Sequence, residues 1–83
     1  MIYVFAILQL MEKVTNNLRV LRAGRRMTQE ELANRVDVTR QTINHIENNL
    51  YIPSLGLAFK ISRVFHKDIE EVFKYNEIKE NKK

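Results

Sequence analysis

The chain has 83 residues, 45% of them hydrophobic and two of them glycine, so it is one small domain near the lower size limit for a self-sufficient core. It has no cysteine, which excludes disulfides and thiolate zinc sites, and its two histidines lie too far apart in sequence to indicate a metal site. We therefore expect a cytoplasmic protein without a metal or another cofactor. The net charge of +4, with arginine concentrated in the first half, favours an acidic partner but indicates no particular fold.

Residues 1–11, MIYVFAILQLM, are almost continuously hydrophobic. They are too short for a membrane span, which needs about 20 residues, and they lack the basic start and small-residue cleavage site of a secretory signal. Two alternatives remain: Met11 is the biological start, or the segment is a strand or helix that packs against its own domain or a second subunit. The sequence thus divides into an N-terminal extension (1–11), a domain (12–76) and a charged tail (77–83).

The first helix is expected over residues 17–23, with Leu18 and Leu21 facing the core and Gly24 as its C-cap. A second helix is expected to begin after Thr28, because Thr28 and Glu31 have the spacing of a capping box.

A third helix is expected to follow a tight turn, with Thr39 as its N-cap. Each of these two helices has only a narrow apolar stripe, so the two must pack on each other and on further helices. The stripe residues are Leu32, Ala33 and Val36 in one helix and Ile43 and Ile46 in the other.

The turn at Pro53 and Ser54 predicts the start of a fourth helix. Its apolar stripe contains Leu57, Ala58, Ile61, Val64 and Phe65. A second capping box, Asp68 with Glu71, predicts a short fifth helix that carries Ile69, Val72 and Phe73. The fold expected from the residues is therefore an all-α, compact bundle of five helices.

The stretch TQEELANRVDVTRQTINHIEN and the continuation IENNLYIPSLGLAFKISRVF resemble the lambda-repressor-like (Cro and Xre) family of helix-turn-helix proteins, over roughly residues 17–75. Two positions depart from the family pattern. Asp37 stands where the turn usually has glycine, and Arg26 stands where a glycine often precedes the first signature helix. The family positions that match are Gln29, Leu32, Ala33, Val36, Val38, Ile43 and Ile46.

The resemblance implies that the helix after Thr39 enters the major groove of double-stranded DNA with its N-terminus first. Arg40 is then placed to bind guanine or phosphate, and Gln41 to pair with adenine. Gln29 lies at the N-terminus of the second helix, where backbone N–H groups and the helix dipole favour a phosphate, so its amide is expected to contact one. The resemblance further implies a structural ion pair between Arg22 and Glu47. The remaining residues expected at the DNA are Thr39, Thr42, Asn44, His45 and Asn48.

The sequence therefore predicts a sequence-specific transcriptional regulator, specifically a repressor, that binds an inverted repeat as a homodimer. The alternative is an antitoxin or adaptor-type module that uses the same fold to bind a protein partner. No catalytic residue is expected, because His45 lacks an accompanying nucleophile or partner base. The protein is accordingly not expected to be an enzyme or to associate with a membrane.

Overall fold

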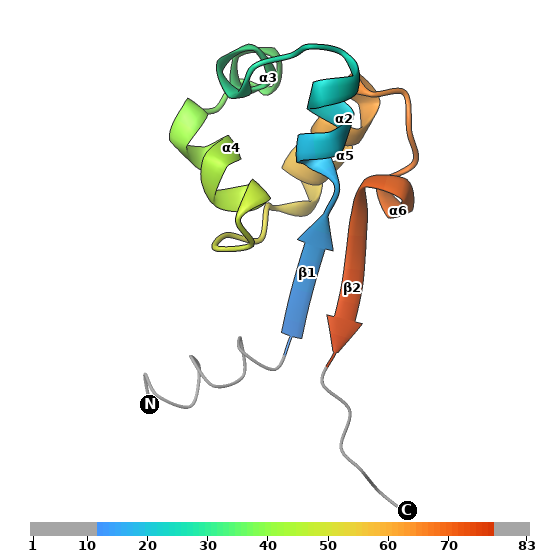
Figure 1. Ribbon diagram of the computed structural model, residues 1–83. Coiled ribbons are helices and arrows are strands. Elements are labelled where there is room, and N and C mark those ends of the chain that lie inside the picture. The colour runs from blue at the N-terminus through green and yellow to red at the C-terminus, as the bar shows by residue number, and fades with distance from the viewer. Residues whose placement is uncertain (1–11, 78–83) are drawn as a thin grey trace, which may run out of the picture.

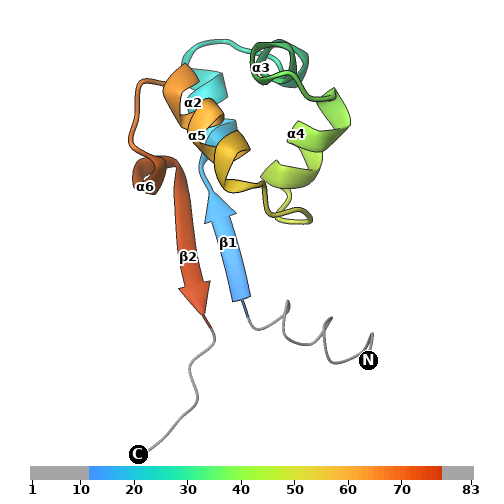
Figure 2. The ribbon, with the colours of Figure 1, turned by 180° about the vertical axis from the view of Figure 1, so that it is seen from behind.

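The computed structural model describes residues 12–77 as five helices and a two-stranded sheet (Figure 1). In chain order the elements are β1 (Glu12–Asn16), α2 (Leu18–Gly24), α3 (Gln29–Val36), α4 (Arg40–Glu47), α5 (Leu55–Val64), α6 (Ile69–Val72) and β2 (Phe73–Glu77). The helices gather into one body, and the strands project from it as a ribbon (Figures 1 and 2). Within these residues, no helix has the length and apolar character to cross a membrane. The expected extension, 1–11, and positions 78–83 of the expected tail lie outside the described residues.

The core lies where the apolar stripes of the helices meet. Helix α3 packs on α4 and α5, and α5 packs on α6. None of these helices exceeds ten residues, so their stability comes from this shared burial rather than from helix propensity. The stripes predicted for α3 and α4 are confirmed. The buried apolar residues of the cluster are Leu18, Met27, Leu32, Ala33, Val36, Ile43, Ile46, Ile61, Phe65 and Val72.

Side-chain caps fix the starts of the helices. The Glu31 N–H donates to Thr28 Oγ1 over 3.0 Å and the Thr28 N–H donates to Glu31 Oε1 over 2.8 Å, which completes the predicted capping box of α3. Thr39 Oγ1 accepts from the Thr42 N–H at the start of α4, over 3.1 Å. Ser54 caps α5 in the same way. The predicted starts of these three helices are therefore confirmed.

The ends of four helices use left-handed residues other than glycine, which carry a conformational cost. The prediction that Gly24 forms the C-cap of α2 is wrong. Helix α2 runs through Gly24, and the Met27 N–H closes its end on the Arg22 carbonyl oxygen over 2.9 Å, so the left-handed position falls on Arg26. The four left-handed residues are Arg26 (φ 53°), Asp37 (φ 63°), Asn49 (φ 61°) and His66 (φ 55°).

The sheet makes the all-α prediction wrong in one respect. Strands β1 and β2 pair antiparallel, with Val14 opposite Tyr75 and Asn16 opposite Phe73. The fifth helix was expected to include Phe73, but α6 ends at Val72 and Phe73 begins β2 with extended backbone. The Asn17 N–H donates to the Val72 carbonyl oxygen over 3.2 Å, and this bond continues the pairing of the strands into the helical body. Glu77, expected to open the charged tail, is the last residue of β2.

Candidate nucleic-acid interface

Helices α3 and α4 are joined by the three residues 37–39, which form a tight turn. Asp37 takes the left-handed backbone that glycine usually supplies at such a turn. The Val38 N–H then donates to the Ala33 carbonyl oxygen over 3.0 Å, and the Val38 side chain packs against the core. This departure from the glycine pattern is therefore accommodated without a change in the turn.

Helix α4 has one buried face and one free face. Ile43, Ile46 and Glu47 are buried, whereas Arg40 and Gln41 are exposed in the first turn of the helix. Burial thus increases toward the C-terminal end of α4. The free polar side chains concentrate at its N-terminal end, which is the end that enters the major groove in helix-turn-helix docking.

The buried Glu47 carboxylate ties α4 to two other helices. Arg22 of α2 donates to both carboxylate oxygens, from Nε to Oε2 over 2.5 Å and from Nη2 to Oε1 over 2.9 Å. Gln29 of α3 donates from Nε2 to Glu47 Oε1 over 3.0 Å. The Glu47 side chain is fully buried and that of Arg22 is 14% exposed, so solvent screens this pair only weakly. The three side chains together fix the C-terminal end of α4.

The electrostatics of this cluster favour the charged form of both partners. Burial tends to raise the pKa of Glu47, but the hydrogen bonds from Arg22 and Gln29, together with the positive charges of Arg22 and Arg19, outweigh it and hold the pKa below its ordinary value of 4.5. The hydrogen bond to Glu47 likewise raises the pKa of Arg22. The pair therefore stays ionised at neutral pH.

A second anchor comes from Asn16 at the end of β1. Its Nδ2 donates to the Ile46 carbonyl oxygen over 2.9 Å, while its Oδ1 accepts from the Leu18 N–H over 3.1 Å. One side chain thus joins the sheet, the start of α2 and the end of α4. The sequence does not predict this role of Asn16, because nothing near it in the chain indicates a hydrogen-bond partner 30 residues away.

Two of the residues predicted to contact DNA also form side-chain hydrogen bonds within the protein. The Gln29 amide, expected at a phosphate, donates to Glu47. Asn48 donates from Nδ2 to the Asn44 carbonyl oxygen over 3.0 Å, and its Oδ1 accepts from Arg19 Nη2 over 3.2 Å. Both side chains therefore help to hold α4 in place, a structural role that the sequence did not indicate.

The other predicted contacts lie on or beside the first turns of α4. Thr39 Oγ1 and Thr42 Oγ1 are 3.0 Å apart, so the two hydroxyls form a hydrogen bond. Arg40, Gln41 and His45 have no side-chain hydrogen bond or ion pair within residues 12–77, although His45 is half-buried. Arg40 and Gln41 are therefore the side chains of α4 that are both exposed and free to bind a ligand.

Several arginines that appeared available from composition have partners in the folded domain. Arg25 donates from Nη1 to the Val64 carbonyl oxygen over 2.8 Å, and its guanidinium lies 5.3 Å above the centre of the Phe65 ring. The number of arginines alone therefore overstates the surface available to bind phosphate.

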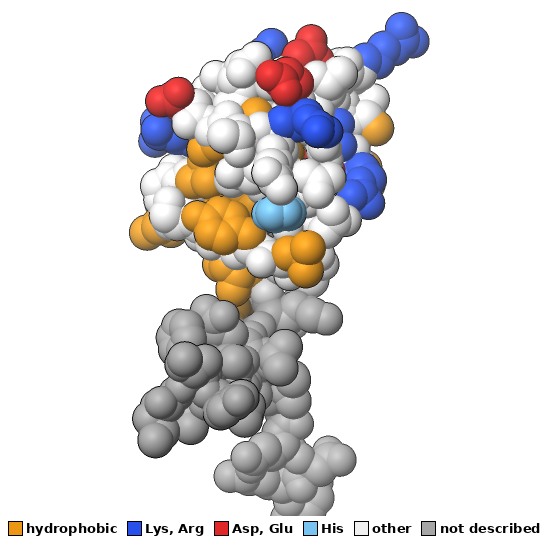
Figure 3. Space-filling view, turned by 90° about the vertical axis from the view of Figure 1, so that its left-hand side faces the viewer, with side chains coloured by type: hydrophobic (Ala, Val, Ile, Leu, Met, Phe, Trp, Pro, Cys, Tyr) orange, Lys and Arg blue, Asp and Glu red, His pale blue; other side chains and the backbone are white. Residues whose placement is uncertain are grey.

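On the side of the molecule that is at the left in Figure 1, charged side chains lie mainly in the upper part of the surface and hydrophobic ones below (Figure 3).

Comparison with known proteins agrees with this geometry. A family model described as helix-turn-helix matches residues 18–72. The chain is 52% identical over 60 residues to an uncharacterized HTH-type transcriptional regulator of Archaeoglobus fulgidus, an alignment that covers 72% of this chain and 84% of the relative. A similarly named protein of Methanocaldococcus jannaschii is 48% identical over 62 residues, covering 75% of this chain and 94% of that protein.

Solved structures show the same fold. The crystal structure of the transcriptional regulator VanUg superposes with a TM-score of 0.65 at 24% identity, covering 81% of this chain and 89% of that one. A candidate DNA-binding protein from Bacteroides fragilis gives a TM-score of 0.66 at 23% identity, covering 74% of this chain and 98% of that one. Because the family model matches about two thirds of its length, the chain belongs to the Cro/C1-type helix-turn-helix family.

Proposed function

We infer that this protein is a sequence-specific DNA-binding transcriptional regulator that reads the major groove with α4. The observation that carries this conclusion is the contrast within α4. Its C-terminal end is fixed by Glu47 and by the Asn16 contact, whereas Arg40 and Gln41 are exposed at its N-terminal end. A reading helix needs both properties, since base contacts give specificity only from a fixed position. The names of the relatives from Archaeoglobus and Methanocaldococcus support the same function.

The chemistry of the exposed side chains suits base edges. The Arg40 guanidinium has the fork geometry that binds guanine O6 and N7, and the Gln41 amide can donate to and accept from adenine N7 and N6. Thr39 and Thr42, beside them, offer hydroxyls to the DNA backbone, and Asn44 and His45 lie one turn further along α4. At the start of α3, the first backbone N–H groups and the partly exposed Gln29 suit a phosphate.

We propose that the active form is a homodimer on an inverted repeat and that it acts as a repressor. Helix α4 has only eight residues, so one copy reads too few base pairs to select a site. Two copies with reading helices about 34 Å apart, one turn of DNA, would supply the missing specificity. Repression follows if such a site overlaps a promoter, because the bound dimer would exclude polymerase.

Selection from random duplex DNA tests the function directly. We expect the full-length protein to enrich a palindromic sequence and the Arg40→Ala variant to lose preference at one base pair in each half-site. Arg63→Ala removes the same charge from the exposed surface of α5 and should enrich the unaltered palindrome. If the full-length protein enriched no sequence, the antitoxin or adaptor alternative would replace this proposal.

A further inference from the structure

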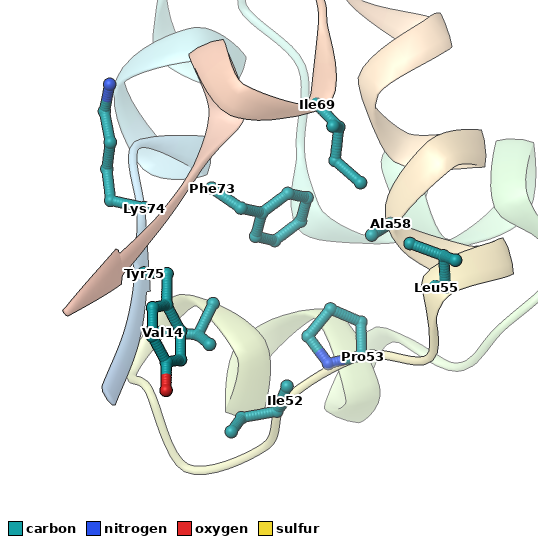
Figure 4. Close-up of a pocket in the computed structure, with 9 residues that line it drawn as sticks. All are labelled: Val14, Ile52, Pro53, Leu55, Ala58, Ile69, Phe73, Lys74 and Tyr75. Carbon is teal, nitrogen blue, oxygen red and sulfur yellow. The ribbon is translucent and has the colours of Figure 1, made fainter. Parts of the chain in front are cut away.

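An apolar groove lies on the side of the domain where the sheet meets α5 and α6. Its volume is about 370 Å³. Eight of its lining residues are hydrophobic and one is charged (Figure 4). These residues are Val14, Ile52, Pro53, Leu55, Ala58, Ile69, Phe73, Lys74 and Tyr75.

The side chains around the groove face one another across an open space. Ile69 and Phe73 point into it from α6 and β2, and Pro53 lies opposite them on the segment before α5 (Figure 4). The Lys74 side chain extends away from the groove, so its charge does not enter the apolar space (Figure 4). The groove therefore fits a hydrophobic occupant and offers no charged group to bind a polar one.

Exposed hydrophobic side chains extend the groove onto the surface. We call the set that follows α4, together with the outer face of α5, the 50–59 surface. A hydrophobic surface of this kind on a small domain commonly marks an interaction site. Its members are Leu50 (74% exposed), Tyr51 (46%), Ile52 (46%), Leu55 (68%) and Phe59 (45%).

We propose that residues 1–11 of the same chain bind in this groove and cover part of the 50–59 surface. Ten of these eleven residues are hydrophobic, Gln9 is the one polar residue, and none is charged. Their composition therefore matches the wall of the groove. Burial of the two apolar surfaces against each other removes both from water, which is the main favourable term in such an association.

Residues 1–11 are joined to the groove by a short stretch of chain, so they can reach it. Val14 lines the groove, and Glu12 is only two residues, about 7 Å of strand, before it. Eleven extended residues reach about 36 Å, so the segment can fold back over the groove with length to spare. A tethered segment has an effective concentration in the millimolar range, about a thousandfold above a second copy at micromolar protein. This ratio favours binding within one chain over exchange between two.

Disulfide trapping tests the proposal in the full-length protein. The chain has no cysteine, so a pair of introduced cysteines can form only one intramolecular disulfide. We choose Phe5→Cys with Leu55→Cys, and we repeat the pairing with Tyr3→Cys and with Ile7→Cys to sample the register. In the control, Val20→Cys replaces Leu55→Cys, because Val20 is 71% exposed, is closer to the segment along the chain and does not line the groove.

Mild oxidation at micromolar protein should give an intramolecular disulfide with Leu55→Cys at least about tenfold faster than with Val20→Cys, because docking raises the local concentration at the groove. Equal rates at the two sites would overturn the proposal. Disulfides that form only between chains would also overturn it, since the occupant would then be the segment of a second copy.

A second measurement detects the uncovered groove. The double variant Phe5→Glu and Leu8→Glu should release the segment, because two charges cannot enter the apolar space. The fluorescence of an apolar dye should then rise, while circular dichroism stays unchanged. The conservative variant Phe5→Leu with Leu8→Ile should bind as little dye as the original chain. Equal dye binding by the charged and conservative variants would contradict the proposal.

Discussion

Replacing Arg22 with alanine should destabilise the domain, because it leaves the buried Glu47 carboxylate without its main partner. The variant loses both hydrogen bonds to that carboxylate and a third, 2.8 Å long, from Arg22 Nη1 to the Met27 carbonyl oxygen. What remains at Glu47 is the neutral amide of Gln29 at 3.0 Å and the Arg19 guanidinium, whose Nε is 3.5 Å from Oε1. The carboxylate would therefore be buried with incomplete compensation.

The expected loss follows from the burial of the two partners. Removing one member of a fully buried pair costs about 3–5 kcal/mol, and we expect about 3 kcal/mol here because Arg19 can move closer and partly replace the charge. That is a large share of the ~5–15 kcal/mol that stabilises a typical domain. Urea unfolding at pH 7, followed by circular dichroism, measures the free energy of unfolding of the original chain and the variant.

A double-mutant cycle separates the pair from its surroundings. Arg22→Met with Glu47→Leu removes both charges, so we expect it to cost less than the sum of the single changes by at least about 1 kcal/mol. Arg19→Ala is the control, since Arg19 has a side chain that is 63% exposed and should contribute less than about 1 kcal/mol. If the costs of the two single changes simply added up in the double variant, Arg22 and Glu47 would not be energetically coupled.

Three further predictions concern acid, DNA and helix ends. Because the pKa of Glu47 is lowered in the folded state, its contribution to folding stability is present above the ordinary pKa of 4.5 and is lost as pH falls through the lowered pKa. Between pH 7 and pH 3 the urea midpoint should therefore fall less for the double variant Arg22→Met with Glu47→Leu than for the original chain. Arg40→Ala should weaken binding to the selected duplex by about 1–3 kcal/mol and leave the melting temperature unchanged, as measured by fluorescence anisotropy and thermal unfolding. His66→Gly should stabilise the domain by about 0.5–1 kcal/mol, because exposed His66 is left-handed where glycine has no such cost; an unchanged or lower urea midpoint would contradict this.

The parts of the fold that the sequence predicts are those set by neighbouring residues. The capping box of Thr28 and Glu31 and the Thr39 cap are local, so the starts of α3 and α4 could be placed correctly. The sheet was missed because Val14 pairs with Tyr75, 61 residues later, and neither strand has the strong apolar alternation that marks a half-buried strand.

The same distinction holds at the candidate site. The exposed polar turn of α4 follows from helix periodicity, so Arg40 and Gln41 could be chosen from the sequence. The contact of Gln29 with Glu47 depends on how α3 crosses α4, which no local pattern specifies. Arg22 was paired with Glu47 through family resemblance rather than from the residues themselves. The left-handed Arg26 was likewise unexpected, since Gly24 was the apparent choice for a helix end.

If α4 reads a specific DNA sequence, the dissociation constant of the protein must depend strongly on the sequence of the duplex. The full-length protein is titrated at physiological salt with the duplex enriched by selection and with a scrambled duplex of the same length and composition. We expect binding to the enriched duplex at least about a thousandfold tighter than to the scrambled one, the lower end of the range for specific regulators. Equal affinity for the two duplexes would contradict sequence-specific reading by α4.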